Sequence, residues 1–311
     1  MSRMFNLIEN KEFWGIQGTG EPMAFRTWSD FDASTLTDKD TDTLIEPCSN
    51  GLIYKAKLNT NFDPAAKTFT MNPELTKFNY KTSYHIPSMY GAESSPLMYR
   101  NLFYIVDGSG TILCMDINTL EPAWIAHTLG DGNATMVLEE TEDGVFLYEG
   151  NSVDQANHLN CNLRKFNALT GEQIWQYDIP CIFTELHGGL LATPLIGKDD
   201  ISNMIIFNVA RTKSENSGEL VALDKKTGKP VWIKEQNTYS WSSPISIKGD
   251  DGKTYGIYCD FLGNMHLFDP KTGEDYDKIS LGLNVEASPS AYNNMIVVGT
   301  YAQKIYGVKI K

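Results

Sequence analysis

Short apolar runs bounded by turn residues follow one another along most of the chain, and helical periodicity is hard to find. Examples are NLFYIV at 101–106, MIIFNV at 204–209 and MIVVGT at 295–300. Each run has the length and the β-branched and aromatic composition of a strand. Dipeptides that suit tight turns separate the runs, such as Asp107-Gly108 and Asp251-Gly252. The pattern therefore predicts an all-β protein.

A short signal recurs ahead of successive strand groups: a small residue, then Ser or Thr, then usually Pro. Its six copies begin at residues 33, 94, 134, 192, 242 and 287, so neighbouring copies are 40 to 61 residues apart. The repeat from 192 to 235 contains four strand-like runs, ATPLIG, MIIFNVA, GELVALD and PVWIKE. Repeats of this length with four strands each are typical of propeller blades, which bury their faces only against neighbouring blades. We therefore predict a β-propeller with six four-stranded antiparallel blades.

A second motif lies between the third and fourth strands of several repeats. Its copies are CMDINTLEPAW at 114–124, KFNALTGEQIW at 165–175, ALDKKTGKPVW at 222–232 and LFDPKTGEDYD at 267–277. The Gly supplies the backbone of a tight turn, and the Asp can accept hydrogen bonds from the turn N–H groups. We expect Trp124, Trp175 and Trp232 to project from the outer strand into the gap between neighbouring blades, which is a structural docking role. Two copies deviate, with Leu120 in place of Gly and Asp277 in place of Trp.

The second motif, AxDxxTGxxxW, resembles the tryptophan-docking motif of the pyrroloquinoline-quinone-type (PQQ-like) β-propeller repeat family. The resemblance covers residues 31 to 311, and members include exported clostridial proteins and the scaffold lipoprotein of the outer-membrane β-barrel assembly machine. GNMHLFDPKTGE and NVEASPSAYNNMIVVGT carry the likeness to the clostridial proteins. It implies one propeller domain over residues 1–311, exported to the cell envelope or outside it. Members commonly have eight blades, so six copies also suit a fragment of an eight-bladed parent.

Composition and charge argue against certain classes of partner. The formal net charge is −13, which argues against nucleic acid and anionic membrane surfaces as partners. No stretch approaches 18 apolar residues, so no membrane insertion is predicted. The N-terminus, MSRMFNLIENKEFWGIQ, lacks the apolar core of a signal peptide, so export rests on the resemblance alone. We expect a monomer.

Cysteine and histidine patterns give no catalytic or metal-binding motif. The five cysteines include no CxxC pair, and Cys114 and Cys259 lie in apolar runs, so we expect buried free thiols there. The five histidines never pair at HxH or HxxxH spacing, so no metal site is predicted. Quinoprotein dehydrogenases resemble this fold, but they typically carry two adjacent cysteines under the quinone, and this chain has no such pair.

Residues just before the innermost strands form the candidate ligand site. We expect them at one rim of a central channel, and the candidates are Asp32, Glu93, Asn133, Trp241 and Glu286, with Leu191 at the remaining entry. Their oxygen atoms suit a hard cation such as calcium, and the Trp suits stacking on a sugar or a peptide. The alternative is a solvated polar rim without a ligand.

The last repeat offers only three strand-like runs, ASPSAY, MIVVGT and KIYGVKI. An open strand edge invites aggregation, so a fourth strand is expected from elsewhere. EFWGIQ at 12–17 has the right length, and we predict that residues 12–17 pair with residues 304–310 and complete the last blade.

These features favour a non-catalytic binding or scaffold module whose partner, a protein, a small molecule or a carbohydrate, is not identified by the sequence. The alternative is a quinoprotein-like oxidoreductase, or another enzyme that uses the mouth of the channel. Exposed apolar loops would favour the scaffold, and a stacking Trp above a cation-binding channel would favour the enzyme.

We expect the purified protein neither to bind pyrroloquinoline quinone nor to oxidise alcohols or sugars with it. The candidate rim is acidic and would repel the three carboxylates of the quinone. Fluorescence titration with the quinone and calcium, followed by a dye-linked assay, tests this. Micromolar binding with substrate-dependent dye reduction would favour the oxidoreductase instead.

Overall fold

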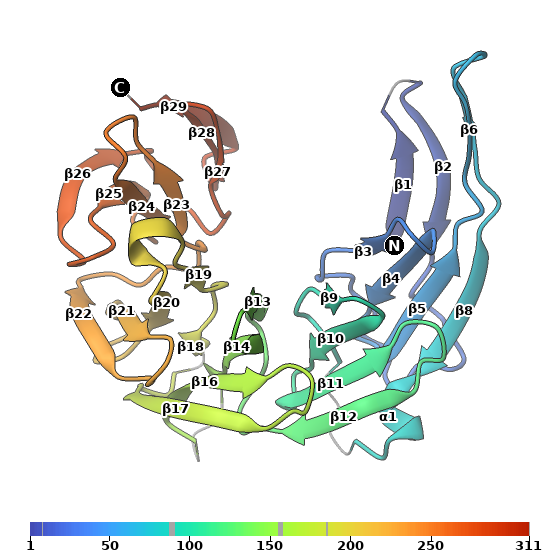
Figure 1. Ribbon diagram of the computed structural model, residues 1–311, viewed down its shortest axis with the longest axis horizontal. Helices are drawn as coiled ribbons and strands as arrows, with labels where there is room; N and C mark the ends of the chain where they lie inside the picture. Colours follow the sequence, from blue (N-terminus) through green and yellow to red (C-terminus); the bar gives the residue numbers. More distant parts are fainter. Residues whose placement is uncertain (8, 87–90, 155–157, 185, 311) are drawn as a thin grey trace. The chain divides into compact units, whose positions relative to one another are not determined.

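The computed structural model describes residues 1–7, 9–86, 91–154, 158–184 and 186–310 (Figure 1). Half of the chain is strand and only 2% is helix, so the predicted all-β class is confirmed. The chain divides into two compact units, unit 1 (Met1–Thr128) and unit 2 (Leu129–Lys311).

Unit 1 is built from antiparallel sheets and hairpins, with one short helix among its described residues. The elements are the hairpin β1 (Ser2–Asn6) and β2 (Lys11–Ile16); a sheet of β3 (Leu36–Asp38), β4 (Thr43–Pro47), β5 (Leu52–Lys57) and β8 (Glu74–Asn79); the hairpin β6 (Asn61–Asp63) and β7 (Thr68–Thr70); helix α1 (Tyr80–Ser83); and a sheet of β9 (Leu97–Tyr99), β10 (Leu102–Val106), β11 (Thr111–Asp116) and β12 (Pro122–His127). Each sheet is written in its spatial order, which follows the chain. The β6–β7 hairpin is an insertion between the third and fourth strands of the first sheet.

Unit 2 repeats this arrangement. Its elements are a sheet of β13 (Val137–Thr141), β14 (Gly144–Gly150), β16 (Asn160–Asn167) and β17 (Gln173–Pro180); a sheet of β15 (Ser152–Val153), β18 (Gly188–Leu190), β20 (Met204–Ala210), β21 (Gly218–Asp224) and β22 (Pro230–Gln236), in which β19 (Leu195–Ile196) also pairs with β20; the 3₁₀ turn η1 (Asp199–Ile201); a sheet of β23 (Ile245–Lys248), β24 (Thr254–Cys259), β25 (Asn264–Phe268) and β26 (Asp275–Ser280); and a sheet of β27 (Ser290–Tyr292), β28 (Met295–Thr300) and β29 (Lys304–Lys309). The four strands predicted between 192 and 235 are confirmed as β19 to β22.

The hydrophobic cores of unit 2 lie between successive sheets. On β20, Ile205 and Phe207 join the core shared with β14, β16 and β17, whereas Ile206 joins the core shared with β24 and β25. Adjacent residues of one strand therefore face two different neighbours, which explains the continuous apolar run MIIFNV. A third core fills the space between β23–β26 and β27–β29 (orange and dark red in Figure 1).

Unit 1 follows the same rule. Its larger core lies between the β3–β8 sheet and the β9–β12 sheet, with Ile53 on one side and Phe103 on the other. Its smaller core lies where the β1–β2 hairpin packs on the first sheet, and here Ile16 is buried beside Leu44 and Trp14 is partly buried.

The turn between the third and fourth strands has the same geometry in four sheets. The carbonyl of its Asp or Asn accepts a hydrogen bond from the amide four residues later, and that later residue has positive φ. The amide-to-carbonyl pairs are Leu120 to Asp116 at 2.9 Å (φ 60°), Gly171 to Asn167 at 2.9 Å (φ 75°), Gly228 to Asp224 at 2.8 Å (φ 69°) and Gly273 to Asp269 at 2.7 Å (φ 79°). Leu120 accepts the strained conformation while its side chain is buried in the core of unit 1.

Two tryptophans of unit 2 lie under the turns of the following sheet. The indole N–H of Trp175 donates to the carbonyl of Lys225 at 3.0 Å, and that of Trp232 donates to the carbonyl of Pro270 at 3.0 Å. A Cβ atom on Gly228 would lie 2.7 Å from the Trp175 ring, so the Gly permits this contact. In unit 1, the ring centroid of Trp124 lies 6.1 Å from that of Tyr104.

Helix α1 was not predicted from the sequence. The side chain of Asn79 accepts a hydrogen bond from the amide of Thr82 at 2.9 Å and caps the helix. The helix carries Lys81 into the interior, where its Nζ lies 2.6 Å from Oδ2 of Asp107 and both side chains are fully buried. Loss of one partner would leave a buried charge without its counter-charge.

The predicted pairing of residues 12–17 with residues 304–310 stays a prediction. Within unit 1, β2 pairs with β1, and within unit 2, β29 pairs with β28. Deleting residues 1–17 would remove Ile16 from the core of unit 1 in any case, so a lowered melting temperature would not by itself establish that pairing.

The contact between Gly228 and Trp175 can be tested with two glycine substitutions. Gly228→Ala and Gly252→Ala both place a Cβ at positive φ, 69° and 79°, which costs about 1–2 kcal/mol each. A Cβ at Gly252 meets nothing within 4 Å, whereas one at Gly228 meets the indole ring. We expect Gly228→Ala to lose a further 1–3 kcal/mol or so in denaturant unfolding. Equal losses would show that the ring yields without cost.

Candidate functional site

The entries of successive sheets are joined by a repeated hydrogen bond. In unit 2, the amide of Thr193 donates to Oγ of Ser243 at 3.0 Å, and the amide of Ser243 donates to Oγ of Ser288 at 3.1 Å. In unit 1, the amide of Ser34 donates to Oγ of Ser95 at 2.9 Å. At these three junctions, the Ser of the repeated sequence signal therefore accepts a hydrogen bond from the same position of the preceding repeat.

The candidate residues of unit 1 lie two positions before these hydrogen bonds. Asp32 is exposed, and its pKa is raised by partial burial and by the neighbouring charge of Asp30. The carboxylate of Glu93 lies 3.9 Å from the guanidinium of Arg26. The hydrogen bond between Ser34 and Ser95 brings these two strand entries side by side.

The candidate residues of unit 2 have partners of their own. Glu286 accepts hydrogen bonds from Asn284 and from the Tyr301 hydroxyl, both at 2.7 Å. The ring of Trp241 lies edge-on to that of Tyr239, with centroids 6.4 Å apart. The side-chain amide of Asn133 donates to Oγ of Ser152 at 3.1 Å. Whether the five candidates of both units line one channel and hold a ligand stays a prediction.

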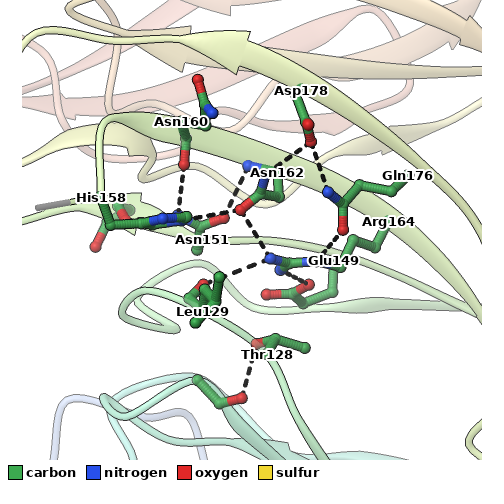
Figure 2. A network of polar contacts seen from close by, with 12 residues as sticks. Thr128, Leu129, Glu149, Asn151, His158, Asn160, Asn162, Arg164, Gln176 and Asp178 are labelled. Carbon is green, nitrogen blue, oxygen red and sulfur yellow. Dashed lines mark hydrogen bonds and ion pairs between the residues drawn. The ribbon is translucent and has the colours of Figure 1, made fainter.

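A buried ion pair forms the centre of a polar network in unit 2 (Figure 2). Nη1 of Arg164 on β16 lies 2.9 Å from Oε2 of Glu149 on β14, and both side chains are almost fully buried. Arg164 also donates to Gln176 at 3.1 Å and to Asn162 at 2.9 Å. Burial raises the pKa of Glu149, and the charge of Arg164 offsets only part of that effect.

The ion pair continues into a network that reaches the strand ends (Figure 2). The side-chain amide of Asn162 donates to Asp178 at 2.7 Å, and the side chain of Gln176 donates to the same carboxylate oxygen at 2.7 Å. Nε2 of His158, in the loop before β16, lies 2.9 Å from Oδ1 of Asn162. The network joins β14, β16 and β17 and the loop before β16, so its geometry stabilises one sheet edge.

A second polar site lies between β22 and the β23–β26 sheet. Its cavity measures about 290 Å³, and His266 is one of its lining residues. Nε2 of His266 lies 3.0 Å from Asp260 and Nδ1 lies 3.1 Å from Asp275, so both ring nitrogens face carboxylates. The imidazole stacks on Tyr258 at 4.4 Å, and Lys234 of β22 donates to Asp275 at 2.6 Å.

The hydrogen bonds to Asp260 outweigh the effect of its burial. Burial by itself would raise the pKa of this carboxyl, but donors from His266 and Asn264 hold the pKa below its usual value. Each ring nitrogen of His266 lies within hydrogen-bonding distance of a carboxylate oxygen. The arrangement is a polar cluster that links β22 to the next sheet through Lys234 and Asp275.

The two polar sites were missed by the sequence analysis, although a signal for them exists. When the repeats are aligned on the third-to-fourth strand turn, Asn162 and Arg164 of β16 fall at the positions of Asn264 and His266 of β25. Polar residues at two alternate positions of an otherwise apolar strand mark a polar stripe on one sheet face. The partner Glu149 could not be found this way, because cross-strand register alone places it opposite Arg164.

The predicted thiols are confirmed as free and buried. Cys114 and Cys259 lie in strands, and burial raises the pKa of each to about 12. These thiols therefore stay protonated at neutral pH and act as small apolar side chains.

No three His, Cys, Asp or Glu side chains are grouped as metal ligands among the described residues. With four residues in α1 and three in η1, neither of the described helices could cross a membrane.

The sequence matches no protein-family model and no curated protein. Among solved structures, the chain resembles the computationally designed Ika8 protein, with a TM-score of 0.59 and 11% identity over 97% of this chain and 75% of that one. It also resembles BamB from Moraxella catarrhalis, with a TM-score of 0.51 and 13% identity over 99% of this chain and 91% of that one. At such identity the likeness shows the fold, which is of the β-propeller class. The count of six blades stays a prediction.

The Arg164–Glu149 pair can be tested by removing the guanidinium. We expect Arg164→Met to lose about 3–5 kcal/mol of unfolding free energy at pH 7, because Glu149 then stays buried without a counter-charge. Burial already raises the pKa of Glu149 in the folded protein, and loss of the Arg164 charge raises that pKa further. As the pH falls towards about 4.5, Glu149 of the folded variant takes up a proton, so the loss of unfolding free energy becomes smaller. Urea unfolding from pH 7 to 4.5 measures this.

The double variant Arg164→Met/Glu149→Leu is the matched control. Without either charge, most of the lost free energy at pH 7 should return. A pH-independent loss in the single variant would assign the effect to packing of the Arg164 stem rather than to charge.

Proposed function

We propose that this protein is a non-catalytic binding or scaffold module of the PQQ-like repeat type, and that its partner is another protein. It would act after export, at the cell envelope or outside it. The observation that carries the proposal is a set of exposed apolar side chains on the loops at one edge of the sheets.

These loops emerge at the same edge, called here the loop edge of unit 2. It comprises the turns between second and third strands, the connections from each fourth strand to the next sheet, and the strand entries described above. In an antiparallel sheet, the ends of the second and fourth strands lie on the same side. Hydrogen bonds join the two kinds of loop: the amide of Leu281 donates to the carbonyl of Gly263 at 2.7 Å, and that of Tyr301 donates to Asn284 at 3.0 Å.

Large apolar side chains on the loop edge are solvent-exposed. They are Leu129, Leu159, Phe183, Leu186, Leu262, Leu283 and Tyr301. Exposed fractions reach 63% for Leu262, 56% for Leu283 and 64% for Tyr301. Groups of apolar residues beside polar ones, such as Glu286, are typical of protein–protein contact surfaces. Among the described residues at the opposite edge of unit 2, exposed large apolar side chains include Leu169 in a turn and Tyr292 at the end of β27.

The likeness to BamB in fold is compatible with a scaffold but carries no partner to this chain. A quinone cofactor fits the candidate residues poorly. Glu286 already accepts hydrogen bonds from Asn284 and Tyr301, and a tri-carboxylate next to acidic residues would be repelled. The scaffold is therefore favoured over the quinoprotein-like oxidoreductase.

The proposal can be tested with a charge placed on the loop edge. Leu262→Asp/Leu283→Asp should abolish capture of the partner from an envelope extract of the source cells, because a buried carboxylate without a counter-charge weakens an apolar interface by several kcal/mol. Quantitative mass spectrometry of proteins bound to the immobilised variant and to wild type measures this. Circular dichroism checks that the variant is folded.

Leu169→Asp is the matched control, because Leu169 is 50% exposed in the turn at the opposite edge. It should keep every partner that wild type captures. If both variants capture the same proteins as wild type, the loop edge is not the binding surface and the proposal fails.

A further inference from the structure

The space between the last two sheets of unit 2 lacks the tryptophan that fills the two preceding spaces. Lys165 pairs with Trp175, Ala222 pairs with Trp232, and Leu267 pairs with Asp277, and in each sheet the register shifts at the next residue. The three outer-strand positions are therefore structurally equivalent. At the third one the side chain is a short carboxylate instead of an indole.

A cavity of about 340 Å³ lies beside Asp277. Its apolar lining comes from both sheets: Ile257, Met265, Leu267, Ile296, Val308 and Ile310. The volume is within the range of small-ligand sites, roughly 300–1,000 Å³, and the cavity is open to solvent. His266, Lys278 and Lys309 complete the lining beside Asp277, so an aromatic ring would contact apolar side chains and have polar groups around it.

One carboxylate beside this cavity can accept the N–H of an indole. At the two filled positions, the indole N–H donates to a backbone carbonyl, that of Lys225 or Pro270. Beside the cavity, Oδ1 of Asp277 accepts from the amide of Lys278 at 2.8 Å. Its other oxygen makes no hydrogen bond or ion pair with any described residue, so it is free to accept an N–H from a ligand.

We propose that this cavity, between β23–β26 and β27–β29, binds a small flat heteroaromatic molecule with an N–H donor, of the indole type. The ring would occupy the place that Trp175 and Trp232 fill in the preceding spaces, and Asp277 would accept the N–H. This site lies between two sheets and is separate from the loop edge, so it goes beyond the proposed scaffold function and does not depend on it.

Isothermal titration calorimetry with indole on the full chain tests the site. We expect saturable one-to-one binding with a Kd of about 0.1–1 mM, as suits nine ring atoms in an apolar cavity. At ten times the Kd, indole should raise the melting temperature by roughly 3 °C. Absence of saturable binding up to 10 mM or so would overturn the proposal.

Two further measurements locate the ring and its hydrogen bond. 1-Methylindole, which lacks the donor, should bind about five-fold more weakly than indole. In Asp277→Ala this preference should vanish while both ligands still bind. Equal affinities of the two ligands for wild type would overturn the role of Asp277 as acceptor.

Asp277→Trp should fill the cavity from within. We expect it to lose indole binding and to melt at a higher temperature, by roughly 3 °C or more, because an indole then packs between the sheets as it does at position 232. Lys226→Trp adds the same side chain at an exposed turn position and should bind indole as wild type does. Indole binding that persists in folded Asp277→Trp would overturn the proposed location of the indole.

If Asp277→Trp does not fold, Asp277→Leu replaces it, because leucine fills part of the cavity. We expect this variant to bind indole more weakly, and unchanged affinity would overturn the proposed location equally.

Discussion

The structure depends on one constraint: a sheet that is apolar on both faces must be covered on both. On β20, alternate residues enter different cores, so neither face can be left to water. Each fully buried aliphatic side chain contributes about 1.5–3 kcal/mol, and these contributions are realised only when the neighbouring sheets are in place. The conspicuous sequence features are accordingly interface features. The indole of Trp175 donates to a turn of the following sheet, Gly228 lies against its ring, and Ser243 joins two strand entries.

The strands and turns could be predicted because their signals are local. An apolar run between turn residues defines a strand wherever it occurs, and the Asp and Gly of the third-to-fourth strand turn act within five residues of each other. The same signals in successive repeats then predict which strands share a sheet. The turn also forms without glycine. At Leu120 the hydrogen bond to Asp116 is present although leucine disfavours the positive φ that the turn requires.

The buried polar sites could not be predicted because they depend on contacts between strands. Glu149 and Arg164 are fifteen residues apart and meet only through cross-strand register. Lys81 reaches Asp107 only because a four-residue helix turns it inward, and the pattern of apolar residues does not predict that helix. The candidate rim residues could be predicted from the sequence only in part. Hydrogen bonds between entries bring neighbouring pairs together, while their role as ligands belongs to chemistry that the repeat pattern does not specify.

The hydrogen bonds between strand entries have a direction. In each described case, the amide belongs to the earlier repeat and the hydroxyl to the later one, as for Thr193 with Ser243 and then Ser243 with Ser288. Each of these hydrogen bonds involves only two adjacent repeats, so its geometry does not depend directly on the number of repeats. Duplication or loss of a whole repeat in the gene would therefore recreate every link at the new junction. These hydrogen bonds by themselves therefore set no limit on the number of repeats, because each one involves only two neighbouring repeats.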